Sequence, residues 1–335
     1  MTDRYIAPDM SLWKGRVDSD ENYDAFRWHQ WMKPLDLSSP DPNTLETLET
    51  ESTVAVALLG FACDEGVRRN LGRVGAAKGP QSIKTELRNL PCSFTQALKL
   101  FDAGTIICDD GDLEKSQEAL ATAVSKLISL NIFPIVLGGG HEVAYGSYTG
   151  LIKQDLYPGI VNFDAHFDIR PYQSRGSSGT MFRQIYDDLN NIGKPFQYFA
   201  VGIQKRGNTV DLFKTMHHMG GEYLMAKDIG EGDLAPSLQK LSTFTQKQEH
   251  IYVTICTDVF SSAFAPGVSA TQPLGLQPER ILKYFKAIFK TGKVVLFDIA
   301  EVSPRFDNDN ITSSLAATFV FSAINSLASI HHIAL

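Results

Sequence analysis

The chain has 335 residues, of which 43% are hydrophobic and 21% are charged, with a formal net charge of −7. This is a globular composition, and the acidic balance excludes the basic surface that nucleic acids or anionic membranes require. The 4 cysteines are widely spaced and form no CxxC pair. They indicate reduced thiols in a cytoplasmic protein rather than a disulfide framework.

The first 50 residues are predicted to form an irregular N-terminal arm or lid. They are polar, and the turn-rich stretch DLSSPDPN occupies residues 36–43. Clusters of Ser, Pro, Asp and Asn favour loops. The opening segment MTDRYIAPDMSLWKGR is charged and has no apolar core, so no signal peptide is expected. Residues 51–335 are predicted to form one catalytic domain.

From residue 52, short apolar runs alternate with amphipathic stretches. Strands are predicted at 53–61, 98–106, 132–138, 159–164, 196–203, 250–256 and 293–300, and helices at 79–90, 113–130, 209–219, 278–292 and 311–327. This alternation predicts a three-layer α/β/α fold with a mostly parallel, doubly wound sheet. The apolar C-terminal run, LAATFVFSAINSLASIHHIAL, is interrupted by polar residues, which favours a buried helix over a membrane span.

The stretch VNFDAHFD places Asp164, His166 and Asp168 at alternate positions behind an apolar run. In an extended chain these side chains point the same way. A divalent metal ion would balance the charge of converging carboxylates. The alternative is that the aspartates cap turns and the histidine is an ordinary polar residue.

Three other motifs follow predicted strands in the same manner. GGGHE carries His141, TICTD carries Cys256 and Asp258, and DIAEVSP carries Glu301. Ligands of open parallel sheets bind beyond the carboxyl ends of the strands. Taken singly, these residues are also compatible with a helix start, a small buried hydrophobe, a turn cap and a solvated acid. Their common position at strand ends favours a metal site.

The ordered motifs GGGHE, DAHFD, APGVSA and AEVSP, together with CDEGVRRNLGRVGAAKGPQSIK at 63–84, resemble the ureohydrolase family, which includes arginase and agmatinase. The resemblance spans most of residues 55–325. It implies an arginase-like fold and two Mn²⁺ ions bridged by a hydroxide, and it is compatible with a homo-oligomer. The segments SSGTMFRQI and APGVSA are most similar to members that hydrolyse N-formimidoyl-L-glutamate to L-glutamate and formamide in histidine degradation.

The resemblance also implies roles for individual residues. One metal would be held by His141, Asp164, Asp168 and residue 256, and the other by Asp164, His166, residue 256 and Asp258. Asp168 would carry a proton to the leaving amine. Glu301 would pair with the cationic amidinium group of the substrate.

Two departures from the family pattern matter. The family usually has aspartate where this chain has Cys256, and a thiolate is a softer ligand, so one site could bind Mn²⁺ weakly or stay empty. A metal-deficient pseudo-enzyme is therefore an alternative. Arginase also has a proton-shuttling histidine after this aspartate-rich motif, and RPYQSRGSSGTMFRQ contains none. This difference argues against arginase.

A substrate with two carboxylates requires cations near the metals. Arg170 and Arg183 are the first candidates, and Arg68, Arg69 and Arg73 are weaker ones; for each, a surface ion pair is the alternative. The other hypothesis for an enzyme is an agmatinase or a guanidino-acid hydrolase. A cationic substrate would instead require an acidic lining.

Overall fold

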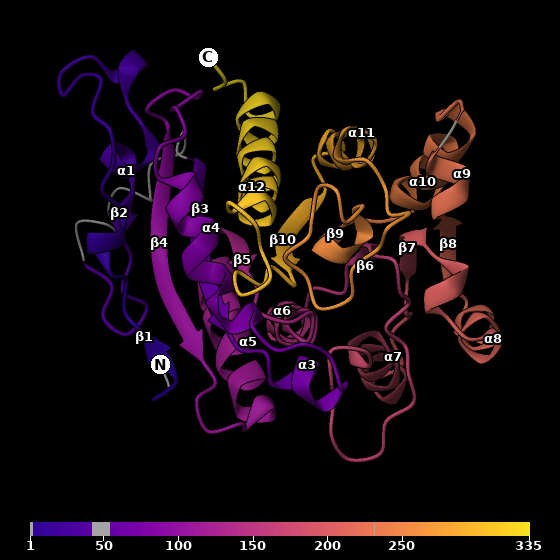
Figure 1. The fold of residues 1–335 in the computed structure, drawn as a ribbon. Coiled ribbons are helices and arrows are strands. Elements are labelled where there is room, and N and C mark those ends of the chain that lie inside the picture. Colours follow the sequence, from indigo (N-terminus) through magenta and orange to yellow (C-terminus); the bar gives the residue numbers. More distant parts are fainter. Residues whose placement is uncertain (1–2, 42–53, 231) are drawn as a thin grey trace.

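A mostly parallel β-sheet runs through the middle of the computed structural model, which describes residues 3–41, 54–230 and 232–335 (Figure 1). The described strands are β1 (Tyr5–Ile6), β2 (Lys33–Pro34), β3 (Val54–Ala62), β4 (Leu98–Ile107), β5 (Phe133–Leu137), β6 (Gly159–Phe163), β7 (Tyr198–Ile203), β8 (Glu222–Met225), β9 (Ile251–Cys256) and β10 (Val294–Ala300). Their order is β1-β4-β3-β5-β10-β9-β6-β7-β8, with β2 beside β4. Only the β1–β4 pair among them is antiparallel. The predicted mostly parallel sheet is confirmed.

Helices cover both faces of this sheet (Figure 1). One apolar core contains side chains of α4 (Gly79–Leu87), α10 (Ala235–Gln246), α11 (Pro278–Phe289) and α12 (Ile311–Ile330). The other contains side chains of α5 (Leu113–Ser129), α6 (Val143–Ile152), α7 (Met181–Asn191) and α8 (Val210–His218). Successive residues of β3 alternate between the cores: Val56 and Leu58 belong to the first, Ala57 and Leu59 to the second. This period of two confirms the three-layer architecture.

Short helical segments complete the described fold. They are α1 (Trp28–Trp31), α3 (Glu65–Arg69), α9 (Ala226–Gly230) and the 3₁₀ turns Met10–Leu12, Tyr23–Ala25, Ala76–Lys78, Lys205–Gly207 and Thr257–Val259.

Helix α6 is an element that the sequence pattern did not predict. It is mostly buried and has no polar face, so it lacks the amphipathic period. Its two glycines allow close packing on α5. A Cβ at Gly146 would lie 2.9 Å from the Gln117 carbonyl oxygen, and one at Gly150 would lie 2.7 Å from Cβ of Val124. Helix propensity argues against these glycines, and tertiary packing outweighs it.

Residues 3–41 pack along the outer edge of the sheet, beside β4. Strands β1 and β2 both pair with β4. Trp28 is fully buried, and Nε1 of Trp13 donates a hydrogen bond to Oδ2 of Asp102 at 2.8 Å. The rest of the predicted arm, residues 1–2 and 42–50, lies outside the described residues, so the boundary near residue 50 stays a prediction.

Helix α12 is the one described helix that is long and apolar enough to cross a membrane. However, 61% of its most apolar window is buried inside the fold, and it packs on α4 and α11. A core helix of this kind has the same composition as a membrane span.

Candidate metal centre

The predicted site residues follow four strands that are neighbours in the sheet. These strands are β5, β10, β9 and β6, in that spatial order. His141 follows β5 after a glycine turn, Glu301 directly follows β10, Cys256 ends β9, and Asp164 directly follows β6. Because the strands are parallel, their carboxyl ends meet at one edge, where ligands of such sheets bind.

Asp164 lies at the centre of the cluster and contacts both histidines. Its Oδ2 is 3.0 Å from Nδ1 of His141, and its Oδ1 is 3.4 Å from Nδ1 of His166. His141 also lies 3.1 Å from Oδ2 of Asp168, and His166 lies 3.1 Å from Oδ2 of Asp258. The structure thus brings these five predicted residues together.

The backbone around the cluster is built for close approach. A Cβ at Gly139 would come within 1.8 Å of the Cys63 carbonyl oxygen, so the turn after β5 can pass the end of β3 only with glycine there. Asp168 and Glu301 both adopt left-handed backbone conformations, with φ of 50° and 69°. Each such conformation costs about 1–3 kcal/mol, and non-glycine residues of this kind cluster at functional sites.

Two contacts behind the cluster orient His141. Its Nε2 lies 3.0 Å from Oγ1 of Thr254, and its backbone N–H donates to Oε1 of Glu301 at 3.0 Å. Because Nε2 is held by Thr254, Nδ1 faces the carboxylates. Residues behind a metal site commonly fix the orientation of a ligating imidazole through such a contact with its other ring nitrogen. The sequence prediction missed Thr254. Its position two residues before Cys256 on β9 was the available signal, because alternate strand residues share a face.

Burial and crowded charges shift the acid–base behaviour of the cluster. Burial alone would lower the pKa of His141, but Asp164 and Asp168 outweigh it and raise that pKa well above the usual value. Burial and the charge of Asp164 raise the pKa of Asp168 to about 7. Burial and the surrounding carboxylates raise the pKa of the Cys256 thiol well above its ordinary range. The centre therefore concentrates negative charge that requires a compensating cation.

The donor atoms form two adjacent groups that fit metal ions. His141, Asp164 and Cys256 make one group, and Asp164, His166 and Asp258 make the other, with the ligand atoms of each group within 4.8 Å of one another. In addition, Oδ1 of Asp258 and Oε2 of Glu301 are buried acceptors with no hydrogen-bond partner among the described residues. Imidazole and carboxylate donors suit Mn²⁺. Cys256 belongs to the first group and not to the second. Asp168 belongs to neither group, but its Oδ2 lies 3.1 Å from Nδ1 of His141, which is a member of the first.

A cavity of about 310 Å³ opens over this cluster, and its lining includes Arg73, Arg170 and Ser178. This size is at the low end for small-molecule sites. Arg183 does not line it, because this arginine pairs with Asp187 on α7 at 3.3 Å. Arg68 and Arg69 are likewise engaged, both by Glu65. Of the five candidate arginines, the structure brings only Arg73 and Arg170 to the cavity.

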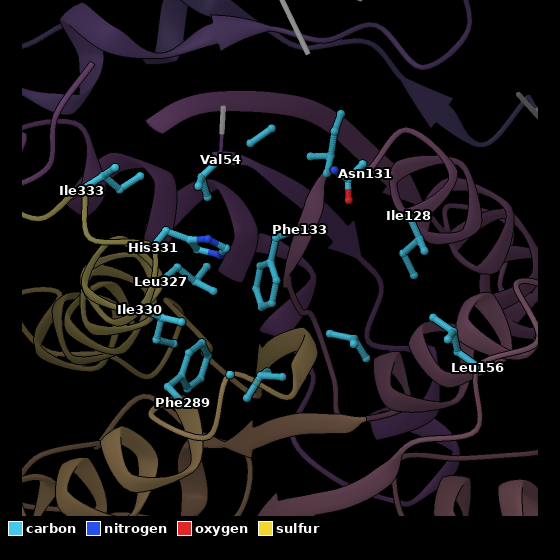
Figure 2. A pocket seen from close by; sticks show the side chains of 15 residues that line it. Val54, Ile128, Asn131, Phe133, Leu156, Phe289, Leu327, Ile330, His331 and Ile333 are labelled. Atoms are coloured by element: carbon cyan, nitrogen blue, oxygen red, sulfur yellow. The ribbon is translucent and has the colours of Figure 1, made fainter. Parts of the chain in front are cut away.

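A second cavity, of about 580 Å³, lies at the opposite, amino edge of the sheet. It is lined by the starts of β3, β5 and β10 and by the ends of α5, α11 and α12. Figure 2 shows Phe133, Phe289 and His331 among its side chains. This lining is mostly apolar and brings together no group of carboxylates and imidazoles, so the smaller cavity over the strand-end cluster is the candidate site.

The fold and the strand-end cluster together define a metal-dependent hydrolase of the arginase type. The model of the arginase family matches residues 54–325, and the chain belongs to that family. Among its relatives, a formimidoylglutamase of Clostridium tetani is 51% identical, over 97% of this chain and 96% of that protein. A formimidoylglutamase of a Geobacillus species is 42% identical, over 96% of each chain.

Solved structures show the same fold. The formimidoylglutamase of Bacillus subtilis superposes with a TM-score of 0.79 at 21% identity, covering 94% of this chain and 96% of that one. The formiminoglutamase of Trypanosoma cruzi, solved with Mn²⁺, gives a TM-score of 0.73 at 24% identity, covering 85% and 98%. At these sequence identities the two comparisons show a shared fold and nothing more.

Proposed function

We propose that this protein hydrolyses N-formimidoyl-L-glutamate to L-glutamate and formamide, a step of histidine degradation, in the cytoplasm. The main observation behind this proposal is that two donor groups share Asp164 at the floor of a cavity. Arg73 and Arg170 lie at the mouth of the same cavity. The formimidoylglutamases among its relatives support the substrate. A homo-oligomer is part of the proposal.

The donor set would hold two Mn²⁺ ions, one in each group. When bound, such a pair supplies a nucleophilic hydroxide at neutral pH by lowering the pKa of bound water. Asp164 would contribute one carboxylate oxygen to each position, as its contacts with His141 and His166 suggest. Thr254 would hold the His141 ring in the orientation that presents Nδ1.

The remaining side chains would position the substrate and move a proton. Glu301 has a buried Oε2 without a partner among the described residues, which suits it to accept from the amidinium N–H groups. The oxygen of water adds to the amidine carbon, and the bond from that carbon to the glutamate nitrogen then breaks. Asp168, beside His141, would deliver the proton that this nitrogen takes up, leaving formamide.

Arg170 is proposed to bind one substrate carboxylate. Among the described residues no carboxylate lies within ion-pair distance of its guanidinium, although Arg68, Arg69 and Arg183 each have such a partner. A cavity mouth with uncompensated arginines favours an anionic substrate over agmatine, which is cationic.

The test is formamide release from N-formimidoyl-L-glutamate by protein stripped with a chelator and reloaded with Mn²⁺. We expect turnover only after reloading, and its loss in Asp168→Asn. Asp187→Asn, which removes a half-buried carboxylate outside the cavity, is the matched control and should stay active. Urea release from agmatine or a guanidino acid without formamide would overturn the substrate assignment. Full metal loading with no turnover of any of these substrates would identify a pseudo-enzyme.

A further inference from the structure

Among the described residues, only neutral groups hold Arg73 at the cavity mouth. Its Nε donates to the carbonyl oxygen of Ser269 at 2.9 Å, and its Nη2 donates to that of Val268 at 2.6 Å. Its guanidinium carbon also lies 4.2 Å above the ring centroid of Phe306. An exposed arginine is ordinarily mobile, but these contacts fix the guanidinium and leave its positive charge uncompensated.

The two neighbouring arginines behave differently. Arg68 pairs with Glu65, and Arg69 pairs with both Glu65 and Glu114. Arg73 has no carboxylate within ion-pair distance among the residues described here, and the same holds for Arg170, which comes from a different loop of the same cavity. The cavity mouth therefore presents two separate cations.

We propose that Arg73 is a second carboxylate anchor beside Arg170, so that the site selects an N-formimidoyl amino acid carrying two carboxylates. This inference rests on the proposed function and specifies how its substrate is chosen. The carboxylates at the cavity floor belong to the metal centre, and two bound divalent ions would balance them. The two arginines are then the cations available to the two carboxylates of the substrate, one for each.

The APGVSA segment, residues 265–270, holds Arg73 in place. Besides the two carbonyl contacts, Oγ of Ser269 accepts the backbone N–H of Arg73 at 2.8 Å. The approach depends on Gly72, because a Cβ there would lie 2.7 Å from the same Oγ. The segment therefore positions Arg73: it fixes the orientation of the guanidinium group, although Val268 lies 195 residues further along the chain.

The experiment compares three substrates: N-formimidoyl-L-glutamate, N-formimidoyl-L-glutamine and N-formimidoyl-4-aminobutyrate. The second has lost the charge of the side-chain carboxylate, and the third has lost the α-carboxylate. We expect Arg73→Gln to lower kcat/KM on N-formimidoyl-L-glutamate about 10- to 100-fold, mainly through KM, because one charge-assisted contact is lost. The same variant should change turnover little on whichever of the other two substrates already lacks the partner carboxylate. Arg170→Gln should show the reciprocal pattern.

Arg68→Gln is the matched control, since it removes an arginine from the same region that does not line the cavity. It should leave kcat/KM on all three substrates within about twofold of wild type. Metal content and thermal midpoint show whether each variant is folded. If Arg73→Gln does not fold, Arg73→Lys replaces it and should show the same substrate pattern with a smaller loss, because the charge remains but the fork does not.

A uniform loss on all three substrates with Arg73→Gln would overturn the proposal, because it would mean that Arg73 only supports the loop. Unchanged turnover of N-formimidoyl-L-glutamate by this variant would overturn it as well. Both results are distinct from failure of the proposed function, in which wild-type protein loaded with Mn²⁺ releases no formamide from any of the three substrates.

Discussion

Cys256 stands where the resemblance to the ureohydrolase family implies an aspartate, and its chemistry can be tested directly. Its sulfur lies in the donor group with His141 and Asp164. Cys256→Asp should raise the affinity for Mn²⁺, because a hard oxygen replaces a soft sulfur. Cys256→Ala should lose at least one ion, because the remaining carboxylates are left around an under-neutralised cation.

Isothermal titration of metal-free protein with Mn²⁺ measures both effects. Cys92→Ala is a control, since Cys92 is a buried thiol in the apolar core that includes Trp28. If Cys256→Ala binds two ions as tightly as wild type and keeps full activity, then Cys256 is a packing residue and no ligand.

Gly179 allows Arg170 and Asn70 to lie side by side at the cavity mouth. A Cβ at Gly179 would lie 2.9 Å from Cδ of Arg170 and 3.1 Å from the Asn70 carboxamide. Gly179→Ala should therefore displace the Arg170 side chain and raise KM for N-formimidoyl-L-glutamate about 10-fold, the value of one charge-assisted contact. Stability should change little, since both neighbours are exposed and can move.

Steady-state kinetics and a thermal melt of the same variant separate these effects. Gly230→Ala serves as the control, because a Cβ there meets nothing within 4 Å. An unchanged KM in Gly179→Ala would show that the position of Arg170 does not matter for binding.

At the scale of elements, a buried ion pair connects α4 to the outer part of the sheet. Nζ of Lys84 lies 2.7 Å from Oδ1 of Asp102, and both side chains are almost fully buried. Asp102 also accepts the indole N–H of Trp13, which ties the N-terminal segment to β4. Lys84→Met should cost about 3–5 kcal/mol in the free energy of unfolding, because it leaves a buried carboxylate without its cation.

Urea denaturation checks this value against Lys153→Met, which removes a surface pair with Glu118. The surface variant should cost less than about 1 kcal/mol. Equal losses in the two variants would contradict the role given to the buried pair.

At the scale of the whole molecule, Mn²⁺ should couple the site to global stability. Four neighbouring strands each bring ligands or acids to one edge, so the folded state binds the ions and the unfolded chain does not bind them in this way. At a free concentration 100 times the Kd, binding at one site adds about 2.7 kcal/mol. Calorimetry should show a thermal midpoint several degrees higher with Mn²⁺ than after chelation.

In Asp258→Asn most of this shift should disappear, since the variant loses an anionic ligand of the second group. A midpoint that is the same in excess Mn²⁺ and in chelator would argue that the cluster does not bind metal in the folded protein.

Much of the fold was predictable because strand and helix periods are local properties. The seven predicted strands correspond to β3, β4, β5, β6, β7, β9 and β10, and the five predicted helices to α4, α5, α8, α11 and α12. Helix α7 was missed, and with it the direction of Arg183. In the helix, Phe182 and Ile185 face the core, while Arg183 meets Asp187 four residues on. A helical turn therefore carries this arginine away from the cavity.

By itself the sequence determined the layered fold and the placement of His141, Asp164, Cys256 and Glu301 at strand ends, because alternation along strands and strand-end position follow from backbone geometry alone. Only the tertiary structure decided which arginines face the cavity. Arg69 and Arg73 are four residues apart, yet one is taken up by Glu65 and Glu114 and the other is fixed by carbonyls at residues 268 and 269. Glu65 is a local partner, four residues before Arg69, but Glu114 and the two carbonyls come from distant parts of the chain, and no local pattern specifies them.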